Sequence, residues 1–280
     1  MIKARDLIEL GKAKLKDEKI PNYKLDARIL LSHILNLENN FLFSDIYVSD
    51  INQETYFEMI RDRVNGKPVS KIISKRSFWN YEFFVNASTL DPRPDSEVLV
   101  EAALETFKLL NKNKLNILEL GVGSGCILLS ILEEVNGAKG WGVDIDFDAI
   151  KAAKINAINM KISDKVNFIV SDWAKSIQGK FDIIISNPPY IKSSQIKSLQ
   201  KEVKDYDPLL ALDGGQDGLD CYKIILKNIK TLMKKQSFLI FEIDFWQGNE
   251  IIELSKQNKL KFLSRKKDLS GQERCLIFKS

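Results

Sequence analysis

Several features are scarce in this chain of 280 residues, and each scarcity excludes a class of protein. The three cysteines are widely spaced and never form a Cys-x-x-Cys pair, which rules out a disulfide framework and a cysteine-built zinc site. His33 is the only histidine, so a histidine base or a histidine-rich metal site is nearly excluded and no metal is expected. No apolar run approaches the ~18 residues of a membrane span, so no membrane association is expected.

The overall composition is that of an ordinary globular protein, with 44% hydrophobic and 29% charged residues. The first residues carry charge throughout and lack the apolar core of a secretory signal. Together with the unpaired cysteines, this predicts a cytoplasmic protein. The net charge of +4 divides evenly between residues 1–85 and the rest, so neither part is a basic arm and no stable nucleic-acid binding is expected.

The pattern of residues predicts three parts along the chain. Residues 1–75 have apolar positions at spacings of three and four, which is typical of helices and predicts a small helical domain. Residues 76–95 contain strand-forming aromatics around Asn80 and then two prolines, which predicts a hairpin followed by an extended connector. Residues 96–280 form the third and largest part.

The third part alternates strands and helices. Strands are predicted at residues 115–120, 139–143, 166–170, 181–186 and 238–243, helices at 126–135, 146–159 and 219–235, and a final hairpin at 260–264 and 274–278. This rhythm predicts an α/β fold with an open, mostly parallel, doubly wound sheet. Ligands bind such sheets at the carboxyl ends of the strands, where the strand order reverses.

A glycine-rich loop follows the first of these strands. It comprises Gly121, Val122, Gly123, Ser124 and Gly125. Glycine allows the backbone to approach a ligand closely, but such a loop suits any nucleotide fold. The sixth position, where a dinucleotide fingerprint has its third glycine, is a cysteine, and the Gly-Lys-Ser/Thr of a P-loop is absent. The loop therefore favours a cofactor without a pyrophosphate.

Two acidic positions follow the next strands. Asp144 ends the second strand about 20 residues beyond the glycine loop, where a carboxylate can accept both ribose hydroxyls of an adenosine. The alternative is that Asp144 or Asp146 caps the following helix. After the third strand, Asp172 and Trp173 could bind the edge and face of an adenine, or could form a turn with a packed ring.

The fourth strand ends in Asn187, Pro188, Pro189 and Tyr190. Each residue before a proline is held extended, and neither proline has an N–H group, so this segment offers acceptors and few donors. The side-chain oxygen of Asn187 and the carbonyl of Pro188 can accept both hydrogens of a planar NH₂ group, while Tyr190 packs against its plane. In isolation the segment could be a rigid turn, but a doubly wound sheet places it beside the glycine loop.

Together these residues resemble the class I S-adenosylmethionine-dependent methyltransferases that act on amino or amide nitrogens. Further segments occur in the order typical of the PrmC or HemK family, the protein-(glutamine-N5) methyltransferases of peptide chain release factors. They are Gly66-Lys67-Pro68-Val69, Phe78-Trp79, Pro92 to Glu97, Asn187 to Ile191, Tyr206-Asp207-Pro208 and Ala211 to Leu219. The family usually has isoleucine and threonine where this chain has Asp91 and Ser96.

The resemblance implies a seven-stranded sheet with a C-terminal antiparallel hairpin and an N-terminal helical domain that docks the substrate. It implies transfer of a methyl group from S-adenosylmethionine, leaving S-adenosylhomocysteine, to the glutamine of the Gly-Gly-Gln loop of release factors. The cofactor positions of the family fall on residues 121–125, Asp144, Trp173 and Asn187. We add Asp172 as a cofactor-binding candidate because it directly precedes Trp173. Residues 187–190 fall on the glutamine-binding motif, with Asn187, Pro188 and Tyr190 as catalytic candidates, and Glu119 is a weaker candidate for the methionine end of the cofactor.

Three alternatives remain at this level. A glutamine methyltransferase of a large-subunit ribosomal protein shares the architecture. An adenine-N6 or other amino-group methyltransferase of DNA or RNA uses the same Asn-Pro-Pro-Tyr motif, although the even charge does not favour it. A helical binding module with a degenerate methyltransferase domain would lack cofactor binding.

Overall fold

The computed structural model describes residues 1–37 and 46–280, and these fall into two units. The first, the helical unit, comprises Met1–Ser74 together with Gln200–Tyr206, and the second, the α/β unit, comprises Lys75–Leu199 and Asp207–Ser280. The predicted boundary after residue 75 lies one residue from this division. The predicted connector, residues 76–95, lies within the α/β unit, and the short segment 200–206 groups with the helical unit, which the sequence did not indicate.

The helical unit is built from the three predicted helices and several shorter elements. Its elements are β1 (Ile2–Lys3), α1 (Ala4–Asp17), α2 (Tyr23–Leu35), β2 (Tyr47–Val48), α3 (Asp50–Val64), α4 (Val69–Ile73) and α8 (Lys201–Lys204). The apolar faces of α1, α2 and α3 bury Leu7, Leu30 and Ile60, and Tyr56 donates its hydroxyl hydrogen to the Ala27 carbonyl at 3.1 Å. The predicted helices are present and most of their periodic apolar positions lie in the core of this unit, but Leu10 and Leu25 are 47% and 45% exposed.

Segment 200–206 is attached to the helical unit by an ion network centred on the buried Arg63, in which Glu202 is half-exposed. Arg63, only 4% exposed, donates from Nε to Asp26 at 2.6 Å and contacts Glu202 through Nη2 at 2.7 Å. The hydroxyl of Tyr206 donates to the Asn65 carbonyl at 3.3 Å. A guanidinium satisfied by two carboxylates in this way is costly to break, because either partner would be left unpaired.

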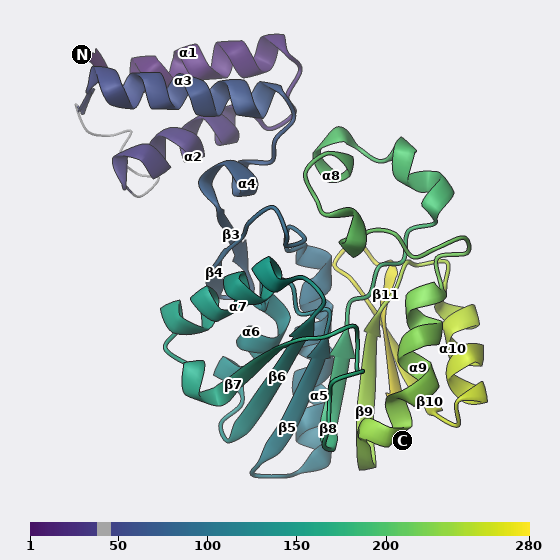
Figure 1. Cartoon of the computed structure of the whole chain (residues 1–280). Coiled ribbons are helices and arrows are strands. Elements are labelled where there is room, and N and C mark those ends of the chain that lie inside the picture. Colours follow the sequence, from purple (N-terminus) through teal and green to yellow (C-terminus); the bar gives the residue numbers. More distant parts are fainter. Residues whose placement is uncertain (38–45) are drawn as a thin grey trace. The chain divides into compact units, whose positions relative to one another are not determined.

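The α/β unit contains a seven-stranded sheet in the order β10-β11-β9-β8-β5-β6-β7 (Figure 1). Its strands are β5 (Leu115–Leu120), β6 (Ala138–Asp144), β7 (Val166–Val170), β8 (Phe181–Ser186), β9 (Met233–Glu242), β10 (Lys261–Lys267) and β11 (Glu273–Lys279). Strands β7, β6, β5, β8 and β9 run parallel, and β11 and β10 complete the sheet antiparallel. The predicted fold class and the predicted C-terminal hairpin are confirmed.

Helices cover both faces of this sheet. One face packs against α5 (Glu97–Leu110), α6 (Cys126–Glu134) and α7 (Phe147–Asn159), and the other packs against α9 (Asp220–Leu232) and α10 (Gly248–Gln257). Side chains alternate between the two cores along each strand, so Ile183 and Ile185 point to the first and Ile184 to the second. The predicted hairpin is β3 (Lys75–Phe78) with β4 (Tyr81–Phe84), whose Phe78 and Phe83 join the first core.

The predicted helix over residues 219–235 is too long. The structure ends α9 at Leu232 and begins β9 at Met233, which pairs with Phe181. The ammonium of Lys234 then reaches the buried carboxylate of Asp182 at 2.6 Å. Pairing with β8 and this ion contact outweigh the local helical pattern. Helix α10 was not predicted.

Helix length bears on membrane insertion. The longest helix of the described residues, α3, has 15 residues, and α1 and α5 have 14 each. A helix needs about 20 predominantly apolar residues to cross a bilayer. Within residues 1–37 and 46–280, no helix is long and apolar enough to do so.

Candidate active site

A cavity of about 510 Å³ lies at the carboxyl ends of the parallel strands. It is formed where β5 and β8 lie side by side, as expected for the point at which the strand order reverses. Of the candidate residues, those lining it are Gly121, Val122, Gly123, Ser124, Asp144, Asp172, Trp173, Asn187 and Pro189, together with Glu119. Gly125, Pro188 and Tyr190 are not in the lining. One cavity therefore brings together all four segments that the sequence singled out.

The glycine loop requires backbone geometry that other residues rarely adopt. Gly121 and Gly125 have φ angles of +77° and +80°, both in the left-handed region. A Cβ on Gly121 would lie 3.8 Å from the Trp173 ring and 3.9 Å from the Asn187 carbonyl oxygen. The ends of three strands thus converge on one glycine. Gly125 is the N-cap of α6, where a Cβ would lie 3.1 Å from Leu129 and 3.3 Å from Ala153 of α7, so a side chain there would crowd the contact between the two helices.

Asp144 is held by the backbone rather than by a cation. Its Oδ2 accepts the Gly123 N–H at 2.9 Å, and its Oδ1 accepts the Asp146 N–H at 3.0 Å. The cap of α7 is Asp146, which accepts the N–H groups of Asp148 and Ala149. The capping alternative for Asp144 is therefore wrong. Burial raises the pKa of Asp144, and the two N–H groups oppose that rise.

Glu119 is the penultimate residue of β5 and is 1% exposed, although it also lines the cavity. Its Oε2 accepts the N–H of Leu128 in the first turns of α6 at 3.0 Å. Burial raises the pKa of its carboxyl well above the usual range, and the nearby charge of Asp144 adds to the effect, while the Leu128 N–H opposes it. A carboxyl in this setting binds a cationic ligand group favourably, because such a group restores the lost solvation.

The segment after β7 contributes an aromatic wall. Trp173 has a φ of +50° and packs beside the second core, and its indole lines the cavity. The carboxylate of Asp172 also lines the cavity and pairs with Lys175 at 2.5 Å on the surface. The flat ring is positioned to stack on a planar ligand, whereas Asp172 has a partner already.

Asn187 lies one residue beyond the end of β8. Its Nδ2 donates to the Ser96 hydroxyl at 3.3 Å, so its Oδ1 remains as an acceptor. Pro188 and Pro189 are buried, and the Tyr190 carbonyl accepts from Gln247 Nε2 at 3.2 Å. Tyr190 itself is largely buried against the second core. The Asn-Pro-Pro-Tyr segment is therefore fixed at both ends.

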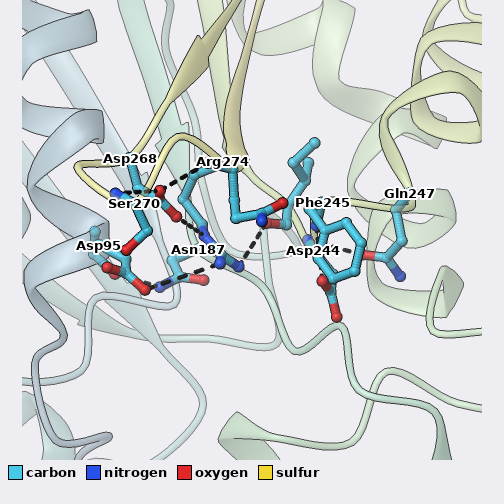
Figure 2. Close-up of polar contacts among 11 residues, drawn as sticks. Asp95, Asn187, Asp244, Phe245, Gln247, Asp268, Ser270 and Arg274 are labelled. Carbon is cyan, nitrogen blue, oxygen red and sulfur yellow. Dashed lines mark hydrogen bonds and ion pairs between the residues drawn. The ribbon is translucent and has the colours of Figure 1, made fainter.

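Three residues around Asn187 were missed by the sequence analysis as functional candidates, namely Ser96, Glu242 and Arg274. Arg274 of β11 donates from Nε to Asp268 at 3.3 Å and from Nη1 to the Ile243 carbonyl at 3.3 Å, and its Nη2 lies 3.9 Å from Asp95 (Figure 2). It ties the final hairpin to the residues just before α5. Glu242 could have been recognised from the sequence, because it is an acidic residue at the end of the apolar run of β9. That strand lies next to β8, which precedes Asn187.

The connector, residues 76–95, also contributes to the cavity and is hydrogen-bonded to Asp207. Asp207 accepts the Asp91 N–H at 3.0 Å through Oδ1 and the Arg93 guanidinium at 2.6 Å through Oδ2. Arg93 lines the cavity, and so do residues 208–211, which follow Asp207. Within residues 1–37 and 46–280, no group of three or more His, Cys, Asp and Glu side chains could hold a metal ion.

Comparison with known proteins identifies the family. Residues 6–73 match the model described as the PrmC N-terminal domain, and residues 94–210 match the model described as the methyltransferase small domain. The release factor glutamine methyltransferase of Rhodospirillum rubrum is 40% identical over 97% of this chain and 83% of its own length. The chain belongs to the release factor glutamine methyltransferase family.

Other comparisons agree with this assignment. The release factor glutamine methyltransferase of Bradyrhizobium diazoefficiens is 36% identical over 85% of this chain and 82% of its own length. Among solved structures, the Thermus thermophilus 16S rRNA N2 G1207 methyltransferase in complex with AdoMet and guanosine superposes with a TM-score of 0.51 at 16% identity, over 74% of this chain and 49% of its own. That likeness shows the methyltransferase fold alone. As a member of the release factor glutamine methyltransferase family, the chain is an enzyme.

Proposed function

We propose that this enzyme transfers the methyl group of S-adenosylmethionine to the side-chain amide nitrogen of the glutamine in the Gly-Gly-Gln loop of a release factor. The observation that carries the proposal is the placement of Asn187, whose Nδ2 is engaged by Ser96 while Oδ1 remains as an acceptor beside the cavity. Family membership supplies the substrate class, since the relatives are named for release factor glutamine. Such a substrate favours a cytoplasmic location.

The charge of the cavity supports a cationic cofactor. Six carboxylates and one guanidinium line it, namely Glu119, Asp144, Asp146, Asp172, Asp213, Asp220 and Arg93. A pyrophosphate would be repelled by this surface, whereas a sulfonium and an ammonium group would be stabilised. The volume of about 510 Å³ lies within the ~300–1,000 Å³ of small-molecule sites. The same acidic lining disfavours a nucleic-acid phosphate backbone.

The proposed positions of the cofactor follow from these contacts. Asp144 would accept the ribose hydroxyls, since one backbone N–H fixes each of its oxygens beside the glycine loop and each oxygen keeps a further lone pair. Trp173 would stack on the adenine, and Glu119 would lie at the methionine end. When bound, S-adenosylmethionine supplies an electrophilic methyl group on a sulfonium.

The chain's own residues would make a poor nucleophile reactive. An amide nitrogen is weakly nucleophilic because its lone pair is delocalised into the carbonyl. Asn187 Oδ1 and the Pro188 carbonyl would accept the two N–H groups and aim the nitrogen face at the methyl. These hydrogen bonds strengthen as positive charge develops on nitrogen, so they favour the transition state over the ground state. These residues would hold the nitrogen in line with the methyl group that the cofactor supplies, and water would take the one proton that the methylated nitrogen has to lose.

The helical unit is the proposed docking surface for the release factor. A glutamine at the tip of a loop fills only a narrow cavity, so a second surface is needed to hold the protein that carries it. Residues 6–73 match the PrmC N-terminal domain, which ties this unit to the same family.

Methyl transfer from labelled S-adenosylmethionine tests the proposal on three substrates: a release factor, the same factor with its Gly-Gly-Gln glutamine changed to alanine, and duplex DNA. Label on the first alone is expected. Label on DNA alone would overturn the substrate assignment while leaving the cofactor site intact. Label on none of the three, with cofactor bound, would favour a ribosomal-protein glutamine instead.

A further inference from the structure

The side-chain amide of Asn187 has two orientations of nearly identical shape. One presents Oδ1 toward the cavity and the other presents Nδ2. Only the first can accept an N–H group of a substrate amide, because Nδ2 is a donor and would repel it. The enzyme therefore needs a device that selects one orientation before the substrate arrives.

Strand pairing places Glu242 beside Asn187. In the parallel register of β8 and β9, Ser186 lies opposite Phe241, so the next residues along the two chains, Asn187 and Glu242, are neighbours. Their side chains point to the same face of the sheet as Ile185 and Ile240, because alternate residues share a face. Glu242 is 2% exposed and ends its strand there.

We propose that Glu242 is a positioning residue that, together with Ser96, accepts both hydrogens of Asn187 Nδ2 and so presents Oδ1 to the substrate amide. The proposal rests on the proposed function, since it assigns the orientation of the group that would hold the glutamine. Asn187 Nδ2 donates one hydrogen to Ser96 Oγ at 3.3 Å, which leaves its second hydrogen for the Glu242 carboxylate on the neighbouring strand. In the proposed arrangement, Ser96 accepts one hydrogen from the amide and donates its own hydroxyl hydrogen to the carboxylate.

The opposite orientation of the amide is unfavourable in this setting. It would place Asn187 Oδ1 against the ionised Glu242 carboxylate, which has only acceptors. Glu242 Oε2 has no hydrogen-bond partner within the described residues, so no second donor there competes with Nδ2. The nearest guanidinium, Arg274, directs its hydrogen bonds to Asp268 and the Ile243 carbonyl (Figure 2). The carboxylate is therefore available to the amide.

The ionisation of Glu242 gives the proposal a measurable signature. Burial raises the pKa of this carboxyl to about 7, although Ser96, Arg274 and Asn187 oppose the rise. The titratable or charged groups that face it from the neighbouring elements are Asp95, Cys126, Tyr190, Tyr222, Arg274 and Cys275. Burial raises the pKa of the two thiols and the two phenols, so these stay neutral around pH 7, and Arg274 stays charged.

The first test follows the Asn187 amide by NMR in the free enzyme. With nitrogen-15 in the asparagine side chains, the signal missing from Asn187→Ala identifies the Nδ2 group. Its shift is expected to change with a midpoint near pH 7 in the wild type and to stay constant in Glu242→Gln. A signal that does not respond to pH in the wild type would overturn the proposal. Because no substrate is present, this result is independent of the proposed function.

The second test compares two replacements of Glu242 in the full chain. Glu242→Met removes the acceptor and is expected to lower kcat about 100-fold, with KM and the Kd for S-adenosylmethionine changed by less than about threefold. Glu242→Gln keeps one acceptor oxygen for Asn187 and is expected to lower kcat only about threefold. Ser96→Ala is expected to fall between them and to be non-additive with Glu242→Met, since both act on one amide.

A matched control separates positioning from folding. Asp182→Asn alters another buried carboxylate, at the opposite end of β8, and is expected to leave kcat unchanged. Unchanged kcat in Glu242→Met, or a kcat loss equalled by a loss of bound cofactor, would overturn the proposal. If Glu242→Met fails to fold, the pH response of the Asn187 signal in the wild type and in Glu242→Gln still decides the question.

Discussion

The buried carboxylates at the two ends of the central sheet differ in whether they form salt bridges. At the amino end of β8, Asp182 receives Lys112 at 2.7 Å, Lys234 at 2.6 Å and the Asn116 N–H at 2.9 Å. At the carboxyl ends of β5 and β9, Glu119 and Glu242 are equally buried, and neither forms a salt bridge within the described residues.

The difference shows in the proton affinity of these groups. Burial alone would raise the pKa of Asp182, but the Asn116 N–H and the two lysines outweigh it and lower the pKa. Burial raises the pKa of Glu242 to about 7 and that of Glu119 well above its usual range. The charge of Asp182 at the amino end of β8 is thus compensated by two lysines, which favours the folded state. At the other end, Glu119 and Glu242 have no salt bridge in the part of the chain that the structure describes and their pKa values are raised, which is typical of functional sites.

The largest expected effect in this comparison comes from Asn187→Ala at the carboxyl end. Removing the amide acceptor should lower kcat by about 10³-fold, since groups that act on developing charge are worth about that much. The Kd for S-adenosylmethionine, measured by calorimetry, should stay within several-fold of the wild type. Full activity in this variant would show that the glutamine clamp is wrongly assigned.

The second largest expected effect is on the pH dependence of the unfolding free energy, which should differ between the two ends of the sheet. The pKa of Glu242 is higher in the folded state, so its contribution to the fold is present below the unfolded value of about 4.5 and is lost as the pH rises to about 7. Relative to Glu242→Gln, the wild type should therefore lose up to about 3 kcal/mol of unfolding free energy over that interval. Urea denaturation at a series of pH values measures this, and a constant difference would contradict it.

Asp144→Ala should act on cofactor binding more than on the reaction. Loss of two ribose hydrogen bonds should raise the Kd for S-adenosylmethionine about 30-fold, or about 2 kcal/mol. Calorimetry gives the Kd, and kcat at saturating cofactor should remain within several-fold. Asp172→Ala is a suitable comparison, because its carboxylate already pairs with Lys175 and a smaller change is expected.

Asp182→Asn should have the smallest effect, and only on stability. Exchanging this carboxylate for an amide should cost about 1.5 kcal/mol of unfolding free energy at pH 7. The pKa of Asp182 is lowered in the folded state, so its contribution exists above the unfolded value of about 3.8 and is lost as the pH falls through the lower folded pKa. The difference from the wild type should vanish in acid, and any loss of kcat would break the proposed separation of the two ends.

Local pattern predicted the elements that are defined by their own residues. The strands at 115–120, 166–170 and 181–186 have the predicted bounds, because each is a short run of mostly apolar residues set off by turn or loop residues. The glycine loop and the Asn-Pro-Pro-Tyr segment were predicted to meet, and they do, because parallel strands end at one edge of a sheet.

Features that depend on contacts between distant segments were not predictable. Ser96 and Glu242 come close to Asn187 only through the packing of the segment before α5 and the register of β8 with β9. Ser96 lies in a segment typical of the family, but nothing in that segment indicates its contact with Asn187. The start of β9 depended on an ion pair between Lys234 and Asp182, which lie far apart in the chain. The assignment of Asp146 rather than Asp144 as the cap of α7 needed the positions of backbone N–H groups.

The grouping of Gln200–Tyr206 with the first 74 residues has a consequence for evolution and for engineering. The chain passes between the two units three times, and the returning stretch depends on Arg63 for the partner of Glu202. Removal of residues 1–74 would therefore leave Glu202 of this returning segment without its Arg63 partner. The two units are therefore expected to be inherited together. Replacing residues 1–74 by those of a relative is expected to require replacement of residues 200–206 as well.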